Sequence, residues 1–207
     1  SHLTPPFRLI ASLTPGYENK VLFELIGEDG RPILRETRVV NFPSGYARID
    51  IAEDFNYAIS GVAETARIRL SVSDEYGRVT SIASVDVLLF TEGRPDYNVP
   101  GDQKENIVIQ SPYPNTTTKG GSVLVSGVAR TQSDLPLEVE LIDRDGNVLA
   151  AVTTPLVFQD GSDYALYAVA IPFTVSEPTW VLITVREEGK RAPGTVHLSS
   201  VEVILSP

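Results

Sequence analysis

The stretch ELIGEDG at Glu24–Gly30 recurs as ELIDRDG at Glu140–Gly146, with five of the seven positions identical. The offset between the two copies is 140 − 24 = 116 residues. A second pair of segments, SVDVLL at Ser84–Leu89 and SVEVIL at Ser200–Leu205, has the same offset, 200 − 84 = 116. Two matches in one register predict that the 207-residue chain contains an internal duplication.

Both copies of the first stretch have the pattern of a β-hairpin. Residues 20–27 and 135–143 alternate apolar and polar side chains with period two, which is typical of half-buried strands. Each strand runs into an Asp-Gly pair and then a second apolar stretch. Because such a turn needs a residue with positive φ, Gly30 and Gly146 are predicted to occupy hairpin turns.

The repeat, the short strands and the spread of 15 Gly and 15 Pro predict an all-β protein with two tandem immunoglobulin-like β-sandwich domains. The first domain is predicted to span residues 1–90 and the second residues 105–207. Residues 91–104, TEGRPDYNVPGDQK, are polar, contain two Pro and two Gly, and are predicted to form the linker.

Period two also predicts which side chains face the cores, since a slip of one residue would turn each apolar row toward water. The inward row is predicted to include four residues of the first domain and the four residues 116 positions later. They are Phe23, Leu25, Val85 and Val87, followed by Val139, Leu141, Val201 and Val203.

The first domain is expected to lack one edge strand. The second domain opens with a predicted strand at residues 106–110, and 107 − 116 = −9 lies before Ser1. The chain is interpreted as an excised fragment because it opens Ser1-His2 without Met. Unless residues 3–6 or the linker fill the place, upstream residues or a strand of a neighbouring chain are expected to complete this edge.

The second domain resembles the immunoglobulin-like domain of bacterial spore germination proteins. The likeness is carried by IVIQSPYP at Ile107–Pro114, GGSVLVSGVA at Gly120–Ala129 and LEVELIDRDGNVLA at Leu137–Ala150, and it continues through IPF at Ile171–Phe173 and VEVIL at Val201–Leu205. The first domain resembles the family through the duplication. The resemblance implies a non-catalytic, secreted or envelope-attached module of a bacterial protein.

Composition excludes several kinds of partner. The net charge is −10 and no basic stripe is present, so nucleic acid and anionic lipid are not expected partners. No apolar run approaches the ~20 residues of a membrane span, so no membrane insertion is expected within this chain. The absence of Cys removes disulfides, thiolate nucleophiles and thiolate metal sites.

Few residues have the types that catalysis requires. His2 lies at the terminus and His197 in the approach to the last strand, so a structural or exposed role is favoured over a general base. Asp50, Glu53 and Asp54 could supply the two carboxylates of a glycoside hydrolase. Their spacing in DIAEDF is instead interpreted as a strand end followed by a solvated turn.

The stretch DRDGN at Asp143–Asn147 is similar to the start of an EF-hand calcium loop. Position 12 counted from Asp143 is Thr154, where that loop needs Glu, and the other copy has Gly27 at the first position. A hairpin turn accounts for both copies, so no metal site is predicted. No catalytic, cofactor-binding or metal-binding residue is therefore assigned, and no cofactor is expected.

Aromatic residues leave one alternative open. Tyr46 and Tyr57 in the first domain, and Tyr164, Tyr167 and Trp180 in the second, could form a sugar-stacking platform, although packing in a core or at its rim is favoured. The chain is predicted to be a non-enzymatic, extracytoplasmic structural or interaction module that works through loops or a sheet edge. A carbohydrate-binding accessory module of a secreted enzyme is the alternative. The protein or cell-wall partner and the oligomeric state stay open.

Overall fold

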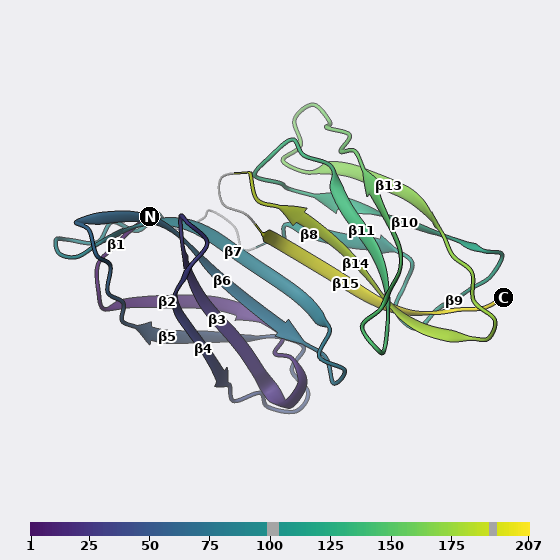
Figure 1. The fold of residues 1–207 in the computed structure, drawn as a ribbon, viewed down its shortest axis with the longest axis horizontal. Coiled ribbons are helices and arrows are strands. Elements are labelled where there is room, and N and C mark those ends of the chain that lie inside the picture. Colours follow the sequence, from purple (N-terminus) through teal and green to yellow (C-terminus); the bar gives the residue numbers. More distant parts are fainter. Residues whose placement is uncertain (99–103, 191–193) are drawn as a thin grey trace. The chain divides into compact units, whose positions relative to one another are not determined.

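Strands dominate the computed structural model, which describes residues 1–98, 104–190 and 194–207 (Figure 1). The single helical segment among these residues is a 3-10 turn at Tyr17–Asn19. The predicted all-β class is therefore confirmed.

The chain divides into two compact units. Unit 1 consists of Ser1–Ser73 and Ala83–Lys104, and unit 2 of Asp74–Ile82 and Glu105–Pro207. Part of the predicted linker, residues 99–103, lies outside the described residues.

Unit 1 is a sandwich-like pair of antiparallel sheets. Its strands are β1 (His2–Leu3), β2 (Phe7–Leu13), β3 (Lys20–Gly27), β4 (Pro32–Val39), β5 (Ile49–Phe55), β6 (Ala63–Ser73) and β7 (Val79–Phe90), of which residues 79–82 are grouped with unit 2. One sheet has the order β4-β3-β6-β7, and β1 runs parallel to β7. The other sheet pairs β2 with β5.

Unit 2 has the same plan with one more strand. Its strands are β8 (Ile107–Ser111), β9 (Thr117–Thr118), β10 (Ser122–Ala129), β11 (Leu137–Asp143), β12 (Val148–Thr154), β13 (Ala165–Pro172), β14 (Thr179–Glu188) and β15 (Thr195–Leu205). One sheet has the order β12-β11-β14-β15, with β9 parallel to β15. The other has the order β13-β10-β8.

Every strand of unit 1 begins and ends within one residue of the place that an offset of 116 predicts. For example, β5 begins at 49 and β13 at 49 + 116 = 165, and β7 begins at 79 and β15 at 79 + 116 = 195. The cross-strand register shifts by one residue in two pairs of strands. His2 pairs with Leu88 whereas its counterpart Thr118 pairs with Leu205, and 205 − 88 = 117. Phe23 pairs with Leu70 whereas Val139 pairs with Val185, and 185 − 70 = 115.

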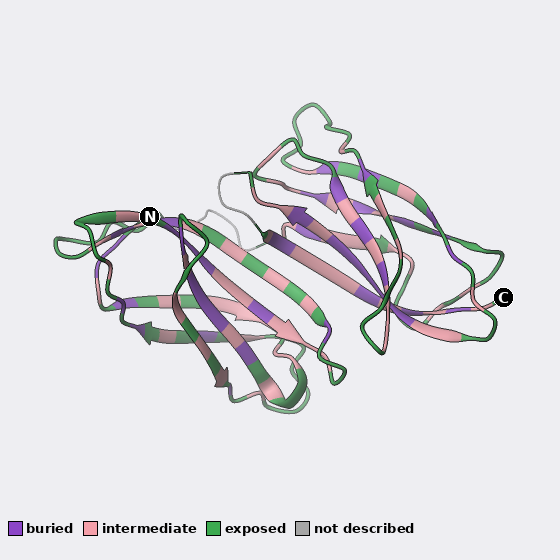
Figure 2. Ribbon diagram, viewed as in Figure 1, coloured by how far each residue is buried: buried purple, intermediate pink, exposed green. Residues whose placement is uncertain are grey.

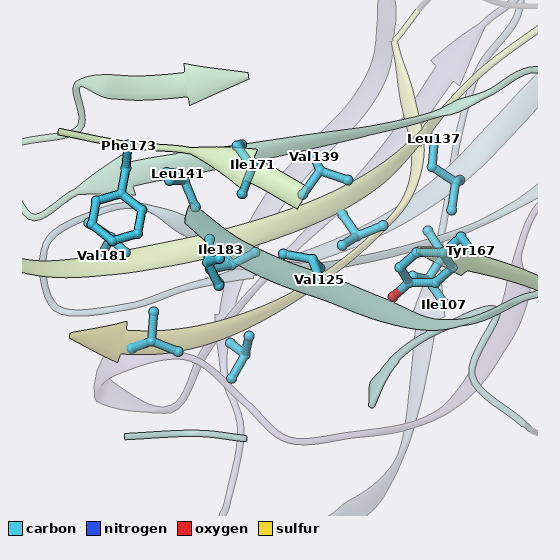
Figure 3. Packing of buried hydrophobic residues seen from close by; sticks show 14 of the residues in the cluster. Ile107, Val125, Leu137, Val139, Leu141, Tyr167, Ile171, Phe173, Val181 and Ile183 are labelled. Atoms are coloured by element: carbon cyan, nitrogen blue, oxygen red, sulfur yellow. The ribbon is translucent and has the colours of Figure 1, made fainter. Parts of the chain in front are cut away.

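The predicted inward row is buried at seven of its eight positions. In unit 2 the side chains of both sheets belong to one core, as Figure 3 shows for Val139 and Leu141 of β11 and Val125 of β10. Val85 is the exception, because 44% of it is exposed whereas its counterpart Val201 is 8% exposed. The prediction for Val85 is wrong for a physical reason. In unit 2 the strand β8 lies against β15, whereas no described strand lies against β7 in the same way.

Neither residues 3–6 nor the described part of the linker, residues 91–98 and 104, occupies the place of β8. In unit 2, β8 pairs with β10, and Val108 lies opposite Val128. In unit 1, residues His2 and Leu3 pair with β7, and the linker residue Asp96 bonds to His2. Among the described residues, β2 pairs with β5 alone.

The predicted hairpin glycines are confirmed. Gly30 has φ 81° and Gly146 has φ 85°, both in the left-handed region. Gly30 N donates to Gly27 O at 2.9 Å, and Gly146 N donates to Asp143 O at 3.2 Å. Each glycine thereby closes a tight turn between two antiparallel strands.

Replacing Gly30 or Gly146 by Ala should lower the free energy of unfolding by about 1 kcal/mol, because a β-carbon is disfavoured at positive φ. Thermal unfolding of each variant measures the effect. Gly61→Ala is the control, since Gly61 is exposed, lacks a positive φ and has room for a Cβ 3.6 Å from its nearest neighbour. Equal melting temperatures for all three variants would contradict the turn assignment.

Candidate functional site

His197 is buried within β15 and not in the approach to it, with 3% of its surface exposed. Asn106 Nδ2 lies 2.8 Å from His197 Nε2, and Arg130 Nε donates to Asn106 Oδ1 at 3.3 Å. On the paired strand β14, Glu187 lies opposite His197 and accepts a hydrogen bond from Gln132 N at 2.7 Å. These hydrogen bonds connect β15 and β14 to the start of β8 and to the segment after β10. His197 therefore has a structural role.

The three candidate carboxylates lie within β5, so their interpretation as a strand end and a solvated turn is wrong. Asp50 and Asp54 are exposed on one face of the strand, and Glu53 is half-buried on the other. Arg8 holds Asp54 through two hydrogen bonds of 2.7 Å each. This hydrogen bonding lowers the pKa of Asp54 below its ordinary value. A glycoside hydrolase needs a carboxyl group with a raised pKa as its acid, so Asp54 is unsuited to that role.

Glu53 belongs to a cluster around Arg38, between β4 and β5. Arg38 Nη1 donates to Glu53, and Arg38 Nη2 donates to Glu36 at 2.7 Å. The Arg38 guanidinium carbon lies 4.3 Å from the centre of the Phe55 ring. Hydrogen bonding to Glu36 is the largest of the contributions that raise the pKa of Arg38. The cluster closes one side of the unit 1 sandwich with charge pairs around a cation–π contact.

Unit 2 closes the equivalent side differently. The counterpart of Arg38 is residue 38 + 116 = 154, which is Thr154, and 1% of it is exposed. Its hydroxyl donates to Ala168 O at 3.3 Å, so a buried side chain reaches the neighbouring strand β13 directly. The charged cluster is therefore particular to unit 1.

Asp143 forms part of the turn. Its Oδ1 accepts hydrogen bonds from the backbone N–H groups of Asp145 at 2.9 Å and Asn147 at 2.8 Å. Its Oδ2 accepts one from Asn147 Nδ2 at 2.9 Å, and this side-chain bond is the largest of the contributions that lower the pKa of Asp143. Among the described residues, no three His, Cys, Asp or Glu side chains are grouped to hold a metal ion.

Two of the candidate aromatics belong to the cores. Tyr57 is 8% exposed, and its hydroxyl donates to Leu3 O at 2.6 Å. Tyr167 is 2% exposed, and its hydroxyl donates to Val108 O at 3.1 Å. Burial raises the pKa of Tyr167 above its ordinary value, so the phenol stays protonated and keeps this bond.

The other three aromatics occupy separate places. Tyr164 lies under the guanidinium of Arg130, at 5.5 Å from the ring centre. Trp180 lies under Arg144 at 4.8 Å. Tyr46 is 64% exposed on unit 1. Two of the five candidate rings are thus buried, and two lie under an arginine guanidinium. The fifth ring, Tyr46, is exposed and could stack on a ligand.

No protein-family model matches the chain, and no curated protein matches it by sequence. Within the described part of the chain, no helix has the length and apolar character to cross a membrane.

On one side of unit 1, no strand of the described residues corresponds to β8. We define this open side by Leu9, Ala11 and Leu13 of β2, which are half-buried, and by the exposed Ala83 and Val85 of β7. The burial colouring in Figure 2 shows exposed bands along β7. The row combines apolar side chains with a strand edge that is unpaired among the described residues, which is the chemistry of a protein-interaction surface.

The sequence contains partial signals for the polar clusters. Glu187 falls in the inward row of β14 with Val181, Ile183 and Val185, so period two could have predicted that it is buried. Arg38 has no such signal, because β4 is an edge strand with mixed exposure and two of its partners, Glu53 and Phe55, come from β5.

The hydrogen bonds of Asp143 predict that Asp143→Ala lowers the free energy of unfolding by about 1 kcal/mol at neutral pH. Because the folded state lowers the pKa of Asp143, its contribution is present above about pH 4 and is lost as the pH falls through the folded pKa. The difference between the wild type and the variant should therefore shrink in acid, which thermal unfolding at pH 7 and pH 3 measures.

Asp145→Ala is the matched control, since it removes an exposed carboxylate of the same turn and keeps the Asp145 N–H bond to Asp143. Equal losses in the two variants would contradict the role of Asp143. Calcium at millimolar concentration should leave the melting temperature unchanged, and a large rise would favour the metal-loop interpretation.

Removing the Tyr167 hydroxyl tests the tie between β13 and β8. Tyr167→Phe should lower the free energy of unfolding by about 1 kcal/mol, because Val108 O loses a buried donor. Tyr46→Phe removes an exposed hydroxyl and should have no effect on denaturant unfolding. Equal midpoints for the two variants would show that the bond does not stabilise the fold.

Proposed function

We propose that this chain is a non-catalytic structural and interaction module of a bacterial envelope or secreted protein. The observation that carries the proposal is the open side of unit 1, where an apolar row and a strand edge lie together. The residues that catalysis would require have structural partners instead. His197 is held by Asn106, and Asp54 is held by Arg8.

The two units are proposed to be immunoglobulin-like domains that arose by duplication of one ancestor. Support comes from the offset of 116 residues, which the bounds of every unit 1 strand follow to within one residue. Further support comes from the shared order of strands, including the parallel pairs β1–β7 and β9–β15. The extracytoplasmic location rests on the resemblance of the second domain to the spore germination family.

A carbohydrate-binding accessory module is the weaker candidate. It would use aromatic rings that are exposed together on one face. Tyr46 is exposed, but Tyr57 and Tyr167 are buried and Trp180 lies under Arg144. The aromatic positions therefore favour protein recognition over sugar stacking.

Cell fractionation tests the proposed location. An antibody raised against the chain should detect the protein in the envelope fraction or the culture medium of the bacterium that encodes it. Detection in the cytosol alone would refute the extracytoplasmic assignment. The chain should also stay in the supernatant when it is mixed with insoluble cell-wall polysaccharide. Sedimentation that Tyr46→Ala abolishes would favour the carbohydrate-binding candidate instead.

A further inference from the structure

The three strands of one sheet of unit 2 contain no charged residue. The sequences of β8, β10 and β13 are IVIQS, SVLVSGVA and ALYAVAIP. The counterparts of β10 and β13 in unit 1 are β2, FRLIASL, and β5, IDIAEDF, which carry Arg8, Asp50, Glu53 and Asp54. Two equivalent sheets of one acidic chain therefore present different chemistry to solvent.

The outward side of this sheet in unit 2 is largely apolar. In β13, Tyr167 and Ile171 belong to the core, whereas Ala168 and Ala170 between them are exposed. An antiparallel sheet with one solvated side usually carries polar residues there, so a strand that is apolar on both sides is typical of a sheet covered on both sides. We call this outward side the uncharged face. Its members are Val108 and Gln110 of β8, Ser122, Leu124, Ser126 and Val128 of β10, and Leu166, Ala168, Ala170 and Pro172 of β13.

The strand register aligns apolar side chains in a row across this face. Val128 lies opposite Val108 on β8 and opposite Leu166 on β13. An isolated bridge places Val157 beside Leu166 in turn. Because directly opposite residues have Cβ atoms about 5 Å apart on the same side of a sheet, the four side chains form one continuous apolar row. The row is open to solvent at one end, since 39% of Leu166 and 59% of Val157 are exposed.

The chemistry of the uncharged face favours a second copy of the chain as its partner. A charged surface would gain no ion pair from this face, and a sugar would find no aromatic ring on it to stack against. Its best match is another flat, uncharged sheet face, and the chain itself supplies one. Two copies of net charge −10 repel each other, and pairing through these faces places no carboxylate of the three strands inside the contact.

The size of the face predicts a weak contact. Its strands have 5, 8 and 8 residues. At a rise of about 3.4 Å per residue and a strand spacing of about 4.8 Å, the face measures roughly 350 Å² in each copy. The two faces together measure roughly 700 Å², which is below the ~1,200 Å² that stable complexes bury. A dimer formed through this face should therefore exchange with the monomer.

We propose that the uncharged face pairs with the same face of a second copy, sheet against sheet, in a dimer with two-fold symmetry. Such a contact uses one patch twice, so a single apolar face is sufficient to specify it. The inference rests on the proposed function as an interaction module and identifies its partner as another copy of the chain. Weak pairing suits modules that are concentrated on a cell envelope, because many such contacts act together there.

Sedimentation equilibrium of the full chain, from about 10 µM to about 1 mM, tests the proposal. The average mass should rise with concentration from that of a monomer toward that of a dimer. Added salt should strengthen the association, because salt screens the repulsion between two chains of net charge −10. A monomer over the whole concentration range would overturn the proposal, and so would an association that salt weakens.

Leu124→Glu locates the contact. Leu124 is 58% exposed, so the monomer tolerates a carboxylate at this position, whereas paired faces would bury it. The dissociation constant of the dimer should rise at least about tenfold. Ile10→Glu is the matched control, because Ile10 lies on the outward side of β2 in unit 1, is 68% exposed and gains the same charge. Equal weakening in the two variants would show that net charge alone governs the association, and would overturn the proposal.

Two further variants keep the test independent of folding. Ala170→Glu on β13, opposite Leu124, should weaken the dimer as Leu124→Glu does. An equimolar mixture of Leu124→Glu and Leu124→Lys should associate more strongly than either variant alone, because the paired faces then carry opposite charges. Such a gain cannot come from unfolding, and its absence would contradict the pairing of face with face.

Vesicles of phosphatidylcholine separate a lipid surface from a second copy as the occupant of the face. The chain should not sediment with these neutral vesicles. Vesicle binding that Leu124→Glu abolishes, in a chain that is monomeric without lipid, would assign the face to lipid and overturn the proposal.

These outcomes are independent of the test of the proposed function. A chain that is found in the envelope but stays monomeric would refute the dimer alone. A cytosolic protein that associates through Leu124 would refute the extracytoplasmic assignment alone.

Discussion

Burial of one apolar row per strand between two facing sheets is the constraint on which both units depend. In unit 2 the rows of three neighbouring strands meet at Val139, Ile183 and Val203, each 0% exposed. Because side chains alternate across a strand, this row fixes the register of every pairing. Loops and turns can then differ between the units without disturbing the core. Where the constraint is relaxed, at Leu9 and Val85, the sandwich of unit 1 is open to solvent.

The two equivalent hairpins show how different side chains stabilise one turn. In unit 2 the carboxylate of Asp143 caps the turn, whereas in unit 1 Asp29 Oδ1 accepts a hydrogen bond from Arg31 N at 3.0 Å. A side chain at the first position in unit 1 would displace the carboxylate of Glu64, because a Cβ on Gly27 would lie 2.4 Å from Glu64 Oε1. The similarity of Asp143–Asn147 to a calcium loop thus follows from the needs of a hairpin: a carboxylate that caps backbone N–H groups and a glycine at positive φ.

Local patterns in the sequence predicted the strands, the hairpin glycines and most of the inward row, because each depends on residues close together in the chain. Long-range features escaped prediction for the opposite reason. Val85 has the alternation of a core residue, but it is exposed where no described strand lies against β7 as β8 lies against β15. Arg38 contacts Glu53 and Phe55 of β5, which pairs with β2 in the other sheet, so no spacing along the sequence indicates these two contacts. The offset of 116 residues likewise does not predict that the pairing of β3 with β6 differs in register by one residue from the pairing of β11 with β14.

Two of the differences between the units lie at one contact. Gly127 gives β8 the space to approach β10, and the Tyr167 hydroxyl then donates to Val108 O. The counterparts in unit 1 are Ala11 and Ile51, which provide neither the space nor the donor. The close approach of β8 to β10 and the hydroxyl that bonds to β8 thus depend on two residue types, Gly127 and Tyr167, that unit 1 does not have at the corresponding positions.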